Sequence, residues 1–135
     1  MEQQIERDAQ CFCCGEDNPG GLHLVFDHRE GEAETSLVVP GYFSGWKGIT
    51  HGGFLSMLLD EVMAHACHGL ASSAVTGEIT VRFLRPVATG TRVRLLGRVE
   101  ENRGRLATTR GWIYDESGAS AVEATAKFVK AKKPA

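Results

Sequence analysis

The sequence has no long hydrophobic run and no excess of charge of one sign. It contains 15 Lys and Arg against 17 Asp and Glu, which gives a formal net charge of −2. This balance excludes the strongly basic composition that is typical of nucleic-acid-binding proteins. No stretch approaches the roughly 20 consecutive apolar residues that a membrane-spanning helix needs. We therefore expect neither a nucleic acid nor a membrane as a partner.

The sequence also lacks the features of a secretory signal peptide at its start. Its first ten residues, MEQQIERDAQ, are polar and mixed in charge, with no basic start and no apolar run. A cytoplasmic location is the expectation. The length of 135 residues and the hydrophobic fraction of 42% predict a single domain over residues 1–135, with a core of its own.

The sequence contains only four cysteines, and only one pair of them has the spacing of metal ligands. Three of the four crowd together at Cys11, Cys13 and Cys14, and the fourth is Cys67. Adjacent cysteines are a poor disulfide pair, which favours a reducing compartment. Cys11 and Cys14 have the spacing of metal ligands, but no second such pair follows. We therefore expect buried thiols and no metal, with a metal at Cys11 and Cys14 as the alternative.

Hydrophobic periodicity predicts one helix among six strands. Alternation predicts a strand over residues 22–27, a turn at 29–31 and a second strand at about 32–39. A three- and four-residue period then predicts a helix from residue 52 to about 70. Turns with Gly separate four further predicted strands in a meander, at about 74–85, 91–101, 105–115 and 119–130. One helix cannot cover both faces of such a sheet, so we expect one curved antiparallel sheet wrapped around it, an α+β fold.

The predicted helix contains no Lys or Arg. One face is apolar and should pack on the sheet. The opposite face has small or soft side chains and one carboxylate: Ser56, Met57, Asp60, Met63, Ala64 and Cys67. A helix without a solvated face needs a second partner in addition to its own sheet. We therefore predict a homo-oligomer, a dimer or a dimer of dimers, with this face at or near the subunit contact.

Asp60 is a candidate general base or nucleophile. Burial of a carboxylate without a cation nearby is costly unless the carboxylate is hydrogen-bonded, and such groups gather at functional sites. The alternative is a purely structural carboxylate bound to backbone amides across the interface.

His51, Gly52 and Gly53 stand where the predicted helix begins. The first N–H groups of a helix have no intrahelical partner and lie at the positive end of its dipole. Glycines let a ligand approach the backbone, and an N–H there can hold a developing oxyanion. Asp60 lies about 12 Å further along the axis than Gly52, a gap that a substrate carbonyl and its attacking water could bridge. The alternative is a tight turn in which His51 hydrogen-bonds the loop.

The run HGGFLSMLLDEVM, residues 51–63, resembles the helix motif of the hotdog-fold thioesterase superfamily, and within it the phenylacetic-acid-pathway type. VRFLRPVATG, residues 81–90, is similar to the strand and turn that follow in that family. CFCCGEDNPGGLHLVF, residues 11–26, resembles the N-terminal stretch of many members. The resemblance covers nearly the whole chain. It implies a hotdog fold and hydrolysis of acyl-CoA or aryl-CoA thioesters, with the CoA thioester as substrate and no cofactor.

The resemblance also implies roles for residues of the helix motif. Asp60 would be the general base or nucleophile, in an active site shared by two subunits. Gly52 would donate its N–H to the thioester oxygen, and His51 would position that carbonyl or the leaving thiolate. Thr76 would orient water from the partner subunit.

Further residues are expected to bind substrate. Arg103, Gly104 and Arg105 form a turn whose cations suit the phosphates of CoA, although ordinary solvation of a turn is the alternative. Gly53 and Glu61 are also assigned to the substrate. Glu61 directly follows Asp60 and points about 100° away on the helix, so it is the alternative working carboxylate if the register differs.

Two features leave alternatives open. Some relatives carry Asn or Gln at the position of Gly45, so the oxyanion site could rest on backbone donors alone. The aromatic residues Tyr42, Phe43 and Trp46 could line an acyl pocket or simply pack the loop.

Other functions on the same fold are a non-catalytic acyl-CoA-binding domain and a hydratase or dehydratase that uses His51 and Asp60 as a pair. The sequence does not identify the acyl group.

Overall fold

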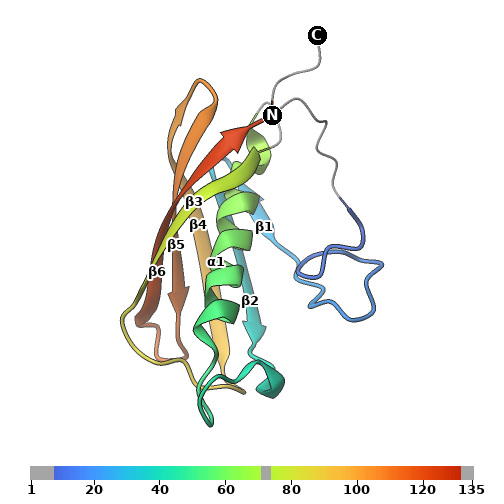
Figure 1. Cartoon of the computed structure of the whole chain (residues 1–135), viewed down its shortest axis with the longest axis vertical. Helices are drawn as coiled ribbons and strands as arrows, with labels where there is room; N and C mark the ends of the chain where they lie inside the picture. The colour runs from blue at the N-terminus through green and yellow to red at the C-terminus, as the bar shows by residue number, and fades with distance from the viewer. Residues whose placement is uncertain (1–7, 71–73, 132–135) are drawn as a thin grey trace.

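The computed structural model describes residues 8–70 and 74–131. One α-helix lies on one face of a twisted six-stranded antiparallel sheet (Figure 1). This confirms the predicted α+β fold. In chain order the elements are β1 (Asp27–Arg29), β2 (Glu32–Val38), η1 (Gly41–Phe43), α1 (Gly52–Ala66), η2 (Cys67–Gly69), β3 (Ala74–Phe83), β4 (Arg92–Arg103), β5 (Leu106–Tyr114) and β6 (Ser120–Lys130).

The strand order is β1-β2-β4-β5-β6-β3, and β1 and β3 form the two edges. The predicted meander is correct for β4, β5 and β6 but wrong for β3, which pairs with β6 instead of β4. Strand β2 takes the place beside β4. The difference arises because the chain crosses the sheet along α1 and returns to it at the edge opposite to β2.

The first strand is shorter than predicted. Residues 22–26 run outside the sheet, and β1 begins only at Asp27. Leu24 and Phe26 are nevertheless buried. The Phe26 ring stacks on His65 of α1, with ring centroids 3.8 Å apart. The alternating pattern therefore reflects packing against the helix and not pairing in the sheet.

Two glycines let α1 approach the sheet closely. Gly97 in β4 and Gly111 in β5 lie directly opposite each other. A Cβ atom at Gly97 would come within 2.4 Å of the Val62 carbonyl oxygen, and one at Gly111 within 3.1 Å of the Met63 side chain. The space at Gly111 is filled by Met63, which is fully buried.

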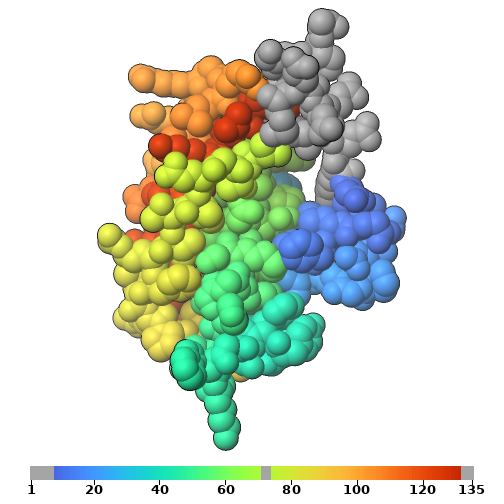
Figure 2. Space-filling model, in the orientation of Figure 1, coloured from blue at the N-terminus to red at the C-terminus, as the bar shows by residue number. Residues whose placement is uncertain are grey.

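This packing corrects the predicted outward face of the helix. Met63 and Cys67 are buried in the core of the chain. The rest of that face is only half-buried, and it consists of Ser56, Met57, Asp60 and Ala64. Figure 2 shows this green helix surface between β3 in yellow-green and the blue N-terminal segment. Within the described ranges, no helix is long and apolar enough to cross a membrane.

Candidate active site

Asp60 and Thr76 form the central contact of the candidate site. The Thr76 hydroxyl donates a hydrogen bond of 2.5 Å to Asp60 Oδ1. Thr76 lies just before Gly77, where the register between β3 and β6 shifts in a bulge. Bulges redirect neighbouring side chains. The Thr76 hydroxyl thus contacts Asp60 of its own chain, and its role in orienting water from the partner subunit stays a prediction.

The Asp60 carboxylate keeps one oxygen available. The side chain is half-buried. In residues 8–70 and 74–131, no ion pair includes Asp60 and no second hydrogen bond reaches it. An ionised carboxylate only accepts hydrogen bonds, so Oδ2 can bind a water or take up its proton.

At the helix start, the N–H of Gly53 is capped by a side chain, whereas the N–H of Gly52 is not. The His51 backbone is extended, and its ring Nδ1 accepts a hydrogen bond of 2.8 Å from the Gly53 N–H. His51 therefore caps the helix through its ring, and its role in positioning the carbonyl or the leaving thiolate stays a prediction. The Gly52 N–H meets no acceptor in the described part of the chain. Of the two candidate donors, Gly52 is the one that can serve a ligand.

Phe83, which the sequence reasoning did not single out, borders this helix start. A Cβ atom at Gly52 would lie 3.3 Å from the Phe83 ring. The ring is 52% exposed. Strand β3 therefore contacts α1 near both candidate groups, through Thr76 at Asp60 and Phe83 at Gly52. The signal for Phe83 was its place in the motif VRFLRP, but the motif does not reveal that contact.

The loop before the helix supplies no side-chain donor at position 45. A Cβ atom at Gly45 would lie 3.2 Å from the His51 Cα. Phe43 stacks on Phe54 of α1, with ring centroids 4.0 Å apart, whereas Tyr42 and Trp46 are about four-fifths exposed. Phe43 is thus a packing residue.

The arginine turn lies at the other end of the sheet from the helix start, in the orange hairpin at the top of Figure 1. Arg103 ends β4, and Gly104 adopts a positive φ of 54°. The Lys130 ammonium donates a hydrogen bond of 3.0 Å to the Gly104 carbonyl. Within one chain the turn contacts neither Asp60 nor the helix start, so its contact with CoA stays a prediction.

Glu61 faces a different neighbour from Asp60, as the helical period implies. Its carboxylate is 3.2 Å from the His65 ring and lies beside Cys11 and Cys14 of the N-terminal loop. The structure thus directs Glu61 away from the Asp60–Thr76 pair.

Three of the four cysteines do not supply a reactive thiolate. Burial raises the pKa of Cys14 to about 12, assisted by hydrogen bonds with Glu61 and Cys11. Burial also raises the pKa of Cys67 to about 11 and that of Cys13 further still. All three are neutral thiols near pH 7, and the thiolate is the nucleophilic form. These three cysteines are therefore not candidate nucleophiles.

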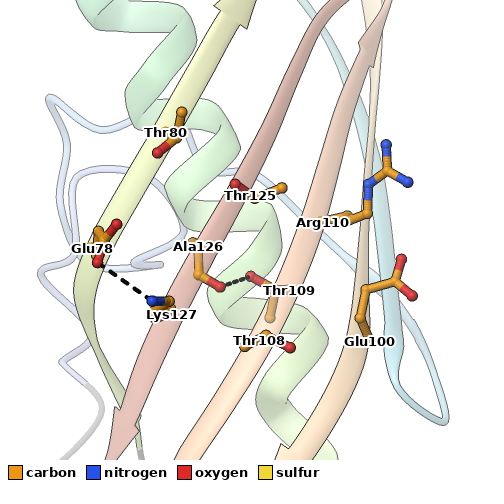
Figure 3. Close-up of a pocket in the computed structure, with 9 residues that line it drawn as sticks. All are labelled: Glu78, Thr80, Glu100, Thr108, Thr109, Arg110, Thr125, Ala126 and Lys127. Atoms are coloured by element: carbon orange, nitrogen blue, oxygen red, sulfur yellow. Dashed lines mark hydrogen bonds and ion pairs between the residues drawn. The ribbon is translucent and has the colours of Figure 1, made fainter.

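A hollow of about 260 Å³ lies on the face of the sheet opposite to α1 (Figure 3). Threonines and charged side chains line this hollow. Two of the charged residues are Glu78 and Lys127, whose charged groups are 3.8 Å apart. Because α1 covers the other face, this hollow does not reach Asp60 or the helix start.

Comparisons with known proteins identify the family of this chain. The family model described as the thioesterase superfamily matches residues 47–131. A curated relative, "Acyl-coenzyme A thioesterase THEM4" from Xenopus laevis, is 30% identical over 118 residues, which are 85% of this chain and 53% of the relative. The chain thus spans about half the length of that curated relative.

Solved structures share the fold. The Escherichia coli PaaI protein from the phenylacetic acid degradation operon superposes with a TM-score of 0.77 at 22% identity, over 82% of this chain and 81% of that one. A hypothetical thioesterase from Streptococcus pneumoniae TIGR4, solved with coenzyme A, superposes with a TM-score of 0.77 at 17% identity, over 83% and 91%. Two further structures of that protein carry alanine in place of one Asp or one Thr.

The matched region contains the helix start, Asp60, Thr76 and strands β3 to β6. The chain therefore belongs to the thioesterase superfamily and has the hotdog fold.

Proposed function

We propose that this protein hydrolyses an acyl-CoA or aryl-CoA thioester to CoA and a carboxylic acid, with Asp60 as general base or nucleophile. The observation that carries the proposal is the half-buried Asp60 carboxylate, held by Thr76 on a helix whose Gly52 N–H has no acceptor in the described chain. The chain's membership of the thioesterase superfamily and its likeness to an acyl-CoA thioesterase support the same reaction.

In the general-base route, Asp60 takes a proton from a water whose oxygen adds to the thioester carbon. The carbonyl oxygen becomes an oxyanion, and the Gly52 N–H donates a hydrogen bond to it. Collapse of this intermediate breaks the carbon–sulfur bond, and the CoA thiolate leaves with the proton held by Asp60. The Thr76 hydrogen bond keeps Oδ1 fixed, so that Oδ2 faces the water.

In the nucleophilic route, Asp60 itself attacks the carbonyl and expels the CoA thiolate. Water then adds to the Asp60 carboxyl carbon of the resulting mixed anhydride, which breaks the bond from that carbon to the bridging oxygen and releases the carboxylic acid. The two routes differ in where the oxygen of water is incorporated. In a single turnover in labelled water, a nucleophilic Asp60 would itself acquire the label.

The spacing of Asp60 and Thr76 supports treating them as one unit. The two residues replaced in the Streptococcus pneumoniae variants are an Asp and a Thr sixteen positions apart. Asp60 and Thr76 have the same separation.

We also propose that the active site is shared between two copies of the chain. Strand β3 is an edge of the sheet, and the face of α1 beside it is only half-buried. A second copy against this side would cover both. Two helices packed antiparallel would bring Asp60 of each chain near the helix start of the other. The substrate would then not have to bridge the separation of about 12 Å between Gly52 and Asp60 of one helix. In such an assembly, Arg103 and Arg105 are assigned to the CoA phosphates.

The test is a CoA-release assay over a panel of acyl-, aryl- and hydroxyacyl-CoA thioesters, with binding of each ester measured in parallel. We expect release from at least one class and its loss in Asp60→Asn. Binding without release would identify the non-catalytic domain instead. Hydration of an enoyl-CoA without thioester cleavage would identify a hydratase. If the protein neither binds nor cleaves any ester of the panel, that result contradicts the proposal.

A further inference from the structure

The N-terminal loop brings two thiols to a carboxylate on α1. Cys11 and Cys14 lie with their sulfur atoms 3.5 Å apart. The sulfur atoms of both cysteines and a carboxylate oxygen of Glu61 all lie within 4.8 Å of one another. All three side chains are half-buried. Figure 2 shows this blue loop against the green helix.

We propose that Cys11, Cys14 and Glu61 bind one zinc ion, with the fourth position open to water or another small ligand. Thiolate sulfur and carboxylate oxygen are both established zinc ligands, and three protein ligands with one open position are a common arrangement. Thiolates favour soft or borderline cations over magnesium or calcium. In the sequence, Cys11 and Cys14 have the spacing of metal ligands but no evident third ligand. The structure supplies Glu61 of α1 as that ligand.

The distances suit a metal ion better than a disulfide. Zinc–sulfur bonds of about 2.3 Å in a tetrahedral site separate two sulfur atoms by about 3.8 Å. The observed 3.5 Å is close to that value. A disulfide bond needs about 2.05 Å, and both cysteines are free.

The loop that presents the cysteines is tightly built. The Gly15 N–H donates to the Cys11 carbonyl at 2.8 Å. A Cβ atom at Gly15 would come within 2.4 Å of backbone atoms of Ala9 and Cys11, so only glycine fits this turn. The N–H of Leu24 donates to the carbonyl of the buried Cys13 at 2.9 Å. The turn therefore holds both thiols on the side that faces α1.

A second layer of side chains orients the carboxylate. His65 lies one helical turn after Glu61, and its Nε2 is 3.2 Å from Glu61 Oε1. Its Nδ1 is 2.9 Å from Nε2 of His28, and its ring stacks on Phe26. Groups of this kind fix the direction of metal ligands. A cavity of about 330 Å³, lined by Cys14, His28 and His65, adjoins the cluster at Cys14.

Metal binding would join the N-terminal loop to α1 directly after Asp60. Zinc replaces one proton on each thiol, so two protons leave for each ion bound. Because the unfolded chain lacks this arrangement, binding stabilises the folded state. The proposal does not depend on the thioesterase reaction, and its test needs no substrate.

The test uses the full chain, purified in reductant, stripped of metal and then loaded with zinc and desalted. We expect one zinc ion per chain, a higher melting temperature than the metal-free form, and a thiolate-to-cobalt charge-transfer band when cobalt replaces zinc. Cys14→Ser and Glu61→Gln should each weaken zinc binding by at least about tenfold, and His65→Ala by about 10- to 100-fold. Cys67→Ala, which removes a buried thiol outside the cluster, should retain wild-type binding.

Two outcomes would overturn the proposal. One is a reduced wild-type chain that retains no zinc and gives no charge-transfer band with cobalt. The other is unchanged zinc content in the double variant Cys11→Ser, Cys14→Ser. If a cysteine variant fails to fold, Glu61→Gln measures the same site without altering the loop.

Discussion

At the level of single residues, the proposed hydrolysis depends on how the Asp60 carboxylate is held. Thr76 donates to Asp60 Oδ1, and this bond leaves the second oxygen for chemistry. A hydrogen bond to a charged group contributes about 1.5–3 kcal/mol, which corresponds to about 10- to 100-fold in rate. We therefore expect Thr76→Val, which removes the hydroxyl but keeps the shape, to lower kcat for CoA release by about that factor.

Thr76→Ser is the matched control for this change because it keeps the hydroxyl. It should retain most of the activity, and the melting temperatures of both variants should show that the fold is unchanged. Equal losses in Val and Ser variants would mean that the hydroxyl does not hold the working carboxylate.

Gly52 offers a test of the oxyanion donor. Proline has no N–H and is well tolerated at the first position of a helix. His51 has φ −61° and ψ 132°, the extended conformation that a residue before proline favours. Gly52→Pro should therefore keep the helix and remove the donor, which should lower kcat by about 100- to 1,000-fold.

Gly52→Ala separates loss of the donor from crowding. It keeps the N–H but adds a Cβ atom 3.3 Å from the flexible Phe83 ring. Steady-state kinetics should show a far higher kcat for Gly52→Ala than for Gly52→Pro. Similar activity in the two variants would exclude the Gly52 N–H as the group that stabilises the transition state.

The sequence predicted some of these residues and missed others for physical reasons. Asp60 and Gly52 stood out because each violates the pattern of an ordinary surface helix. The hydrogen bond between Thr76 and Asp60 was not predicted, because it depends on a bulge beside Thr76 that no local pattern encodes. Glu61 was not connected to Cys11 because the two residues are far apart in sequence and meet only through the folding of the N-terminal loop.

At the element scale, the contact between α1 and the sheet depends on glycine. A Cβ atom at Gly97 would overlap the Val62 carbonyl, which is backbone and cannot rotate away. We expect Gly97→Ala to lower the free energy of unfolding by about 3 kcal/mol, the upper part of the range for overpacking. Gly41→Ala is the control, since a Cβ atom there meets nothing within 4 Å. Denaturant unfolding of both variants measures the difference, and equal stability would contradict this packing.

The elements themselves were largely predictable, but their pairing was not. Local periodicity gave the helix and the strands β2 to β6 within a few residues. Pairing of β3 with β6 joins segments far apart in the chain, and no local pattern encodes it. Burial of Leu24 and Phe26 without strand pairing shows the same limit, because alternation indicates a buried face but does not say which element covers it.

At the scale of the whole molecule, the proposed shared site makes a complementation experiment possible. A dimer that mixes Asp60→Asn chains with Gly52→Pro chains contains one site with both defects and one intact site, if each site draws on both chains. Random mixing should then restore about a quarter of wild-type activity.

If Asp60 and Gly52 of the same chain act together, no mixed dimer has an intact site, and mixing restores nothing. Light scattering on the same samples gives the oligomeric state. A monomer with full activity would contradict the shared site even if Asp60 proves essential.

Asp60, and not its neighbour Glu61, performs the proposed hydrolysis. The most direct measurement is kcat/KM for CoA release from the best substrate, in wild type, Asp60→Asn and Glu61→Gln. We expect Asp60→Asn to lower it by about 100- to 10,000-fold, the range for loss of a general base, while Glu61→Gln stays within a few-fold of wild type. Full activity in Asp60→Asn, or a severe loss in Glu61→Gln alone, would contradict the account.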